Sequence, residues 1–139
     1  MREVGAVIDT LGNVLHWHEP DGSSIGSLPD SRSLWDIIWE THQQKRFAGF
    51  AHTHPGSGWP GPSGTDLTTF RAIERALGVK PLWWIASSDH LVVMRRIVVA
   101  DPDNHDGAAD SYVIYNIDPV FGEVVLAPWA AELRRRSNY

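Results

Sequence analysis

The chain has 139 residues, 42% of them apolar and 21% charged, which is typical of one globular domain, here residues 1–139. It contains no cysteine, which excludes zinc ribbons, thiol proteases, iron–sulfur proteins and disulfide frameworks. The net charge of −5 gives no basic face for nucleic acid. Because no apolar run is long enough for a membrane span or a secretory signal, we expect a cytoplasmic protein without membrane partners.

The first third of the chain predicts a hairpin, a loop and a helix. An apolar run rich in β-branched residues, 4–9, and a second run, 14–17, flank a turn signal and are typical of paired strands. Residues 18–30 are rich in Gly, Pro, Ser and Asp, which favours a surface loop. Helical apolar spacing follows over residues 32–44, with apolar side chains on two sides, which predicts a helix packed between other elements.

The rest of the chain predicts alternating strands and helices. A buried strand over residues 47–51 precedes a Gly/Pro loop at 55–62 and a helix from Ser63 to Leu77 that Gly78 terminates. An Asp-rich loop is expected at residues 101–110. Further strands are expected at residues 82–86, 91–99, 112–117 and 123–127, before a short C-terminal helix. The basic run Arg134 to Arg136 is interpreted as the solvated end of that helix.

Two histidines at the end of the 47–51 strand are candidate metal ligands. Side chains two apart on a strand point the same way, so His52 and His54 can converge on one ion. Asp66, in the first turn of the next helix, can add a carboxylate oxygen. Three protein ligands leave a fourth tetrahedral position open, which is the arrangement of a catalytic zinc. One Zn²⁺ per chain is therefore expected.

Hydrolysis at such a site needs a general base and a donor for the developing oxyanion. Upstream carboxylates are available as the base, and the hydroxyl of Ser63, three residues before Asp66, is a candidate donor. The reaction class that this predicts is hydrolysis of an amide bond.

The segment His52-Thr53-His54-Pro55, followed by Ser63-x-x-Asp66, resembles the signature of the JAMM (MPN-plus) zinc metalloproteases, in particular their bacterial members. That family carries an upstream glutamate in a pattern like Glu-x-Gly-Gly-aliphatic-aliphatic, which Glu3-Val4-Gly5-Ala6-Val7-Ile8 resembles. The resemblance covers roughly residues 3–99. The family usually has six residues between the proline and the serine, whereas this chain has seven, Gly56 to Pro62.

The resemblance implies an α/β (α+β) fold of the MPN and cytidine-deaminase-like kind, a single three-layer domain with a mixed, mostly antiparallel sheet flanked by helices. It also implies that Glu3 is the general base, with Glu40 or Glu19 as substitutes, and that Ser63 stabilises the oxyanion. The implied reaction is zinc-dependent cleavage of the amide bond after the C-terminal tail of a ubiquitin-like protein. The alternatives are a metallopeptidase that processes phage or cell structural proteins, and a non-catalytic MPN scaffold.

Simpler interpretations compete at several of these residues. Ser63-x-x-Asp66 is also the pattern of a helix capping box. His16-Trp17-His18 is a second His-x-His, but no Ser-x-x-Asp accompanies it, so we interpret it as hairpin surface. Residues 56–61 match a dinucleotide-binding glycine pattern, yet the segment contains proline and opens no helix.

Tryptophan is abundant, with seven in the chain. We expect four of them to pack in the core: Trp35, Trp39, Trp83 and Trp84. Trp59 lies in the Gly/Pro loop and is expected to be exposed, where its amphipathic ring, together with Gly58, could contact an extended peptide.

Overall fold

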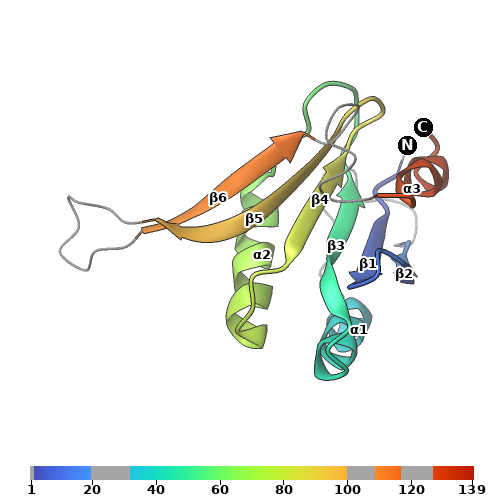
Figure 1. Ribbon diagram of the computed structural model, residues 1–139. Helices are drawn as coiled ribbons and strands as arrows, with labels where there is room; N and C mark the ends of the chain where they lie inside the picture. Colours follow the sequence, from blue (N-terminus) through green and yellow to red (C-terminus); the bar gives the residue numbers. More distant parts are fainter. Residues whose placement is uncertain (1, 20–31, 100–108, 117–126) are drawn as a thin grey trace.

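The computed structural model describes residues 2–19, 32–99, 109–116 and 127–139. Within these ranges the chain forms one six-stranded sheet and three helices (Figure 1). The strands are β1 (Gly5–Asp9), β2 (Val14–His18), β3 (Phe47–Thr53), β4 (Leu82–Ala86), β5 (Leu91–Val99) and β6 (Ala109–Asn116). The helices are α1 (Arg32–Gln43), α2 (Gly64–Leu77) and α3 (Ala130–Arg136). None of the helices in these ranges is long and apolar enough to cross a bilayer.

The sheet is mixed and mostly antiparallel, as predicted. Its strand order is β2-β1-β3-β4-β5-β6, and β3 with β4 is the one parallel pair in the described sheet. A parallel pair needs a crossover connection, and α2 supplies it. The crossover begins at the C-terminal end of β3, so the chain leaves an interior strand and enters a helix close to where the two histidines lie.

Helices cover both faces of the sheet, which gives the three layers expected. On one face, α1 and α2 bury Leu34, Ile38 and Phe70 against strand residues that include Phe50 and Trp83. On the other face, Trp129 and Leu133, from the α3 segment, pack against a second set of strand residues. The two sets alternate along the strands because successive side chains point to opposite faces. Burial of apolar surface in both layers is the main stabilising term.

The predicted element order is confirmed within the described residues, with shifted ends. β3 runs two residues further than expected, to Thr53, because it pairs with β4 to its end. β6 begins at Ala109 rather than Tyr112, since it pairs with β5 as far as Val99, although Ala, Asp and Ser have weak strand preference. Most of the predicted 18–30 loop, the Asp-rich 101–108 segment and residues 123–126 of the last expected strand lie outside the described residues.

The tryptophan prediction is only partly right. Trp83 and Trp84 are buried in the core, and Trp35 is half-buried against it. Trp39 is 52% exposed, so its assignment to the core is wrong. Within the described residues, α1 buries Leu34, Ile38 and Thr41 and leaves Trp39 exposed, so the expected packing on a second side is not seen there.

The C-terminal arginines do not form a merely solvated helix end. Arg134 donates to the carbonyl oxygens of Ser87 and His90, each at 3.0 Å. Arg136 lies over the ring of Trp17, 4.3 Å from its centroid, and its guanidinium also bonds acidic side chains. Arg135 alone of the three is exposed. The prediction is therefore wrong for Arg134 and Arg136, which attach α3 to the sheet.

Candidate metal centre

Strand β3 places His52 and His54 on the face of the sheet that α1 and α2 cover. His52 is 1% exposed and pairs across the strands with Gly5 of β1 and Ile85 of β4. The amide of His54 donates to the carbonyl of Ala86 at 2.8 Å, so the backbone stays extended just past the end of β3. The two Nε2 atoms are 3.0 Å apart. The histidines therefore converge as their spacing predicts.

Aromatic packing fixes the ring of His52. The ring of Phe50 is roughly parallel to it, with centroids 6.2 Å apart, and Phe70 of α2 meets it edge-on at 5.9 Å. Phe50 in turn lies against Gly5, where a Cβ atom would be only 2.3 Å from Cζ of the phenyl ring. A side chain at position 5 would displace Phe50. Gly5 is therefore explained by packing, because the absence of a side chain leaves room for the Phe50 ring that contacts His52.

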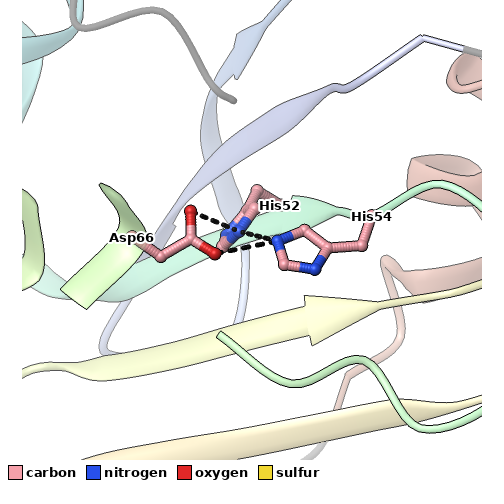
Figure 2. Close-up of side chains that lie close together, drawn as sticks. All are labelled: His52, His54 and Asp66. Carbon is pink, nitrogen blue, oxygen red and sulfur yellow. Dashed lines mark hydrogen bonds and ion pairs between the residues drawn. The ribbon is translucent and has the colours of Figure 1, made fainter. Parts of the chain in front are cut away.

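The first turn of α2 delivers Asp66. Ser63 is the N-cap: its Oγ accepts from the amide of Asp66 at 3.0 Å, and its own amide donates to Asp66 Oδ2 at 2.9 Å. The predicted capping box is therefore present. The same carboxylate faces the histidines, with Oδ2 2.8 Å from His54 Nε2 and Oδ1 3.4 Å from His52 Nε2 (Figure 2). The capping and metal-ligand interpretations of Asp66 are compatible, because the capping hydrogen bond from the Ser63 amide orients the Asp66 carboxylate toward the two histidines.

These three residues form a group that could hold a metal ion. Their candidate ligand atoms all lie within 4.8 Å of one another, and the nearest pairs are 2.8–3.4 Å apart. Tetrahedral zinc with ligand distances of about 2.0–2.1 Å separates its ligand atoms by about 3.3 Å. The observed triangle is close to that size. Two imidazole nitrogens and a carboxylate oxygen are also a donor set that zinc accepts.

The carboxylate of Asp66 is held in its ionised form. Burial raises the pKa of this buried group, but contacts with His52 and His54 and the amide of Ser63 outweigh that effect and hold the pKa well below its usual range. An ionised carboxylate is the form that binds a metal. Nδ1 of His52 is buried and has no hydrogen-bond partner among the described residues, so no protein acceptor there competes for its orientation.

Glu3 lies beside the candidate metal ligands. Gly5 pairs with His52 across β1 and β3, and the amide of Thr53 donates to the carbonyl of Val4, just before β1. This continues the same register by one residue, so Glu3 lies opposite His54. Glu3 is 2% exposed, and its Oε2 atom has no hydrogen-bond partner in the described part of the chain. Burial raises its pKa to about 7; the charge of His54 opposes this rise and that of Asp66 adds to it.

The structure thus discriminates among the three glutamates considered as the base. Glu19 is paired with Arg136 at 3.1 Å and with Arg2 at 3.4 Å. Glu40 is exposed on α1. Of these three, Glu3 is the carboxyl that interacts electrostatically with two of the candidate ligands.

The Gly/Pro loop flanks the site and is anchored to the β4–β5 turn. The amide of Gly58 donates to Asp89 Oδ1 at 2.7 Å, and the hydroxyl of Ser87 donates to the Gly58 carbonyl at 2.6 Å. Trp59 is 54% exposed, as expected. Residues 87–90 link the strands expected at 82–86 and 91–99, and their role in holding this loop was not predicted from the sequence. The available signal was the presence of Ser87 and Asp89, because serine and aspartate side chains often form hydrogen bonds with nearby backbone in turns.

The second His-x-His is not a simple hairpin surface. His18 is buried, 7% exposed, so that prediction is wrong for it, while His16 is half-buried. Their ring centroids are 6.2 Å apart, and the pair belongs to no group of potential ligands in the described ranges.

A scan of the chain against protein families found no matching family, and a search of curated proteins found no significant match.

Proposed function

We propose that the protein is a zinc-dependent isopeptidase or peptidase of the JAMM (MPN-plus) type, which hydrolyses the amide bond after the C-terminal tail of a ubiquitin-like protein. The observation that carries the proposal is the convergence of His52, His54 and Asp66 beside a buried Glu3 whose Oε2 atom has no hydrogen-bond partner among the described residues. These residues come from three separate segments: the end of β3, the first turn of α2 and the stretch before β1. The motif resemblance supplies the MPN type of fold and the substrate class.

The donor set supports zinc as the metal. Two imidazoles and one carboxylate, without thiolate, are typical of catalytic rather than structural zinc sites, and three ligands leave a position open. When bound, zinc would polarise the scissile carbonyl and lower the pKa of a water molecule. His52 is oriented by Phe50 and Phe70, and Asp66 by the cap at Ser63, so the ligands are preorganised.

Glu3 is suited to accept a proton from the attacking water and pass it to the leaving amine. Its carboxyl is desolvated, has a free acceptor atom and has a pKa close to neutrality. Ser63 is suited to the second task. Its Oγ accepts from the amide of Asp66, which leaves its hydroxyl hydrogen available to donate to the carbonyl oxygen as negative charge develops there.

The Gly/Pro loop would hold the substrate tail. Gly58 and Trp59 lie in this anchored loop, and the exposed ring of Trp59 offers an apolar surface with a polar edge to an extended peptide. Narrow tails with small terminal residues, as in ubiquitin-like proteins, would pass such a loop most easily.

The direct test is cleavage of a panel of ubiquitin-like proteins extended past their C-terminal glycines, with and without a chelator, followed by intact mass. We expect cleavage after the terminal glycine that needs zinc and is lost in Asp66→Ala. Cleavage of linear peptides alone would instead favour the processing peptidase. A protein that binds no zinc and cleaves nothing would contradict the proposal and favour the scaffold.

A further inference from the structure

Two buried hydroxyl groups meet behind the metal centre. Thr53 lies between the two histidines on β3, and its side chain points to the opposite face, toward α3. The Oγ atom of Ser137, just after α3, lies 2.8 Å from Thr53 Oγ1, although the two residues are 84 positions apart. Both residues are 0% exposed. A buried polar pair of this kind is costly unless its hydrogen bonds are satisfied, so its geometry is tightly determined.

The same hydroxyl holds the segment that carries Glu3. The amide of Val4 donates to Thr53 Oγ1 at 2.9 Å, whereas a regular antiparallel pair would use the backbone carbonyl of residue 53. The return bond, from the amide of Thr53 to the carbonyl of Val4, is 3.0 Å long. The side chain of Thr53 therefore replaces one ladder hydrogen bond at the residue next to Glu3.

Ser137 holds this arrangement from the other side. It accepts a hydrogen bond from the amide of Arg2 at 3.1 Å through its carbonyl, while its hydroxyl hydrogen is directed at Thr53 or at the carbonyl of Leu133. The segment Arg2–Val4 is thus fixed at both ends of Glu3, once to β3 and once to the end of α3. Val4 itself is fully buried.

We propose that Thr53 and Ser137 are positioning residues that hold Glu3 beside His52 and His54, which makes α3 part of the active-site support. The effect on turnover rests on the proposed function, whereas the effect on the Glu3 segment does not. Removal of the Thr53 hydroxyl leaves the histidines and Asp66 in place but releases the amide of Val4. Glu3 would then lose its alignment without loss of the metal.

The first experiment measures amide hydrogen exchange by NMR in the full chain. Thr53→Val keeps the shape of the side chain and removes the acceptor, so we expect the Val4 amide to exchange about 10-fold faster or more, while Val7, within β1, is unchanged. Thr53→Ser should restore protection. Thr41→Val is the matched control, because Thr41 is also buried but bonds only carbonyls within α1. Unchanged Val4 exchange in Thr53→Val, or equal acceleration in Thr41→Val, would overturn the proposal.

Ser137→Ala gives a milder second variant if Thr53→Val does not fold. It removes one donor to Thr53 and leaves the Val4 acceptor in place, so we expect acceleration of Val4 exchange that is smaller, about 3-fold. Protection of Val4 equal to that of the wild type would count against a role for Ser137.

The second experiment measures turnover of a substrate that the wild type cleaves. We expect Thr53→Val to lower kcat about 10-fold or more with KM within about 2-fold of the wild type and zinc content unchanged, and Thr53→Ser to recover the rate. Full kcat in Thr53→Val would contradict positioning of the base. If the wild type cleaves no member of the panel, the proposed function fails, and the exchange experiment still decides whether the hydroxyl pair holds the Glu3 segment.

Discussion

The chain contains two His-x-His pairs, His16 with His18 on β2 and His52 with His54 on β3. They lie two strands apart on one face of the sheet, because Gly5 of β1 pairs with both His18 and His52. Spacing, strand context and burial of one histidine are common to both pairs. The ring centroids are 6.2 Å apart on β2 and 4.8 Å apart on β3, and only the β3 pair belongs to a potential ligand group in the described residues.

The difference comes from what lies opposite each pair. His52 and His54 lie next to the N-terminus of α2, where the hydrogen bond from the Ser63 amide orients the Asp66 carboxylate toward both imidazole rings. β2 is an edge strand of the described sheet, two strands away from β3 and the helix that follows it. Two histidines at strand spacing are therefore not sufficient; the third potential ligand, delivered by a helix N-terminus, completes the candidate metal centre.

The largest expected effect separates the two pairs directly. His52→Ala and Asp66→Ala should each weaken zinc binding by more than about 100-fold, because each removes a ligand. His16→Ala and His18→Ala should leave one zinc per chain. Calorimetric titration of the metal-free protein measures all four affinities. Equal losses in the β2 and β3 variants would show that the two pairs are not distinct.

A second variant tests the base beside the β3 pair. Glu3→Gln should retain zinc while kcat falls by about 10²–10⁴-fold, since the amide accepts no proton from water. Glu40→Gln is the control, because Glu40 was also considered as the base and is exposed on α1. Turnover of Glu3→Gln at the wild-type rate would remove Glu3 from the mechanism.

The raised pKa of Glu3 predicts a pH dependence of stability in the metal-free protein. Burial raises this pKa from 4.5 to about 7, so between those values the native state binds more protons than the unfolded state, and stability falls as pH rises. At about 1.4 kcal/mol per pKa unit, the penalty above pH 7 is up to about 3 kcal/mol. Glu3→Gln should therefore be more stable than the wild type at pH 8 and equal to it near pH 4.5. Urea unfolding in chelator at both pH values measures the difference, and a constant difference would contradict the assignment.

The smallest effect concerns Gly5, the residue between the two pairs. Gly5→Ala should cost about 1–3 kcal/mol, because the new methyl group overlaps the Phe50 ring that supports His52. Gly64→Ala, at the start of α2, is the matched control, since nothing lies within 4 Å of its Cβ position. Thermal unfolding compares them. Equal stability of the two variants would show that Phe50 moves freely and does not fix the histidine.

Local rules were sufficient for much of the site. Strand spacing predicted the convergence of His52 and His54, and capping chemistry predicted the start of α2 at Ser63, because both depend on neighbours within a few residues. The position of Glu3 was expected from motif resemblance alone, since nothing in its local sequence places it near residue 54.

Contacts between distant segments were not predictable in this way. Periodicity does not show that Trp39 is exposed, or that Arg134 reaches the β4–β5 turn 44–47 residues away. The Ser137–Thr53 bond left no local signal either, because a lone serine after a helix has no preferred long-range partner. These features depend on how the helices and the sheet pack together, and that packing cannot be read from the residues on either side of each position.

The most direct test of the central claim is X-ray absorption at the zinc edge on the protein loaded with one equivalent of zinc. We expect about four nitrogen or oxygen neighbours at about 2.0–2.1 Å, with the outer-shell scattering of two imidazoles. In His52→Ala the imidazole contribution should fall, and in His18→Ala it should not change. A spectrum without imidazole scattering, or one that changes in His18→Ala and not in His52→Ala, would contradict a metal centre at His52, His54 and Asp66.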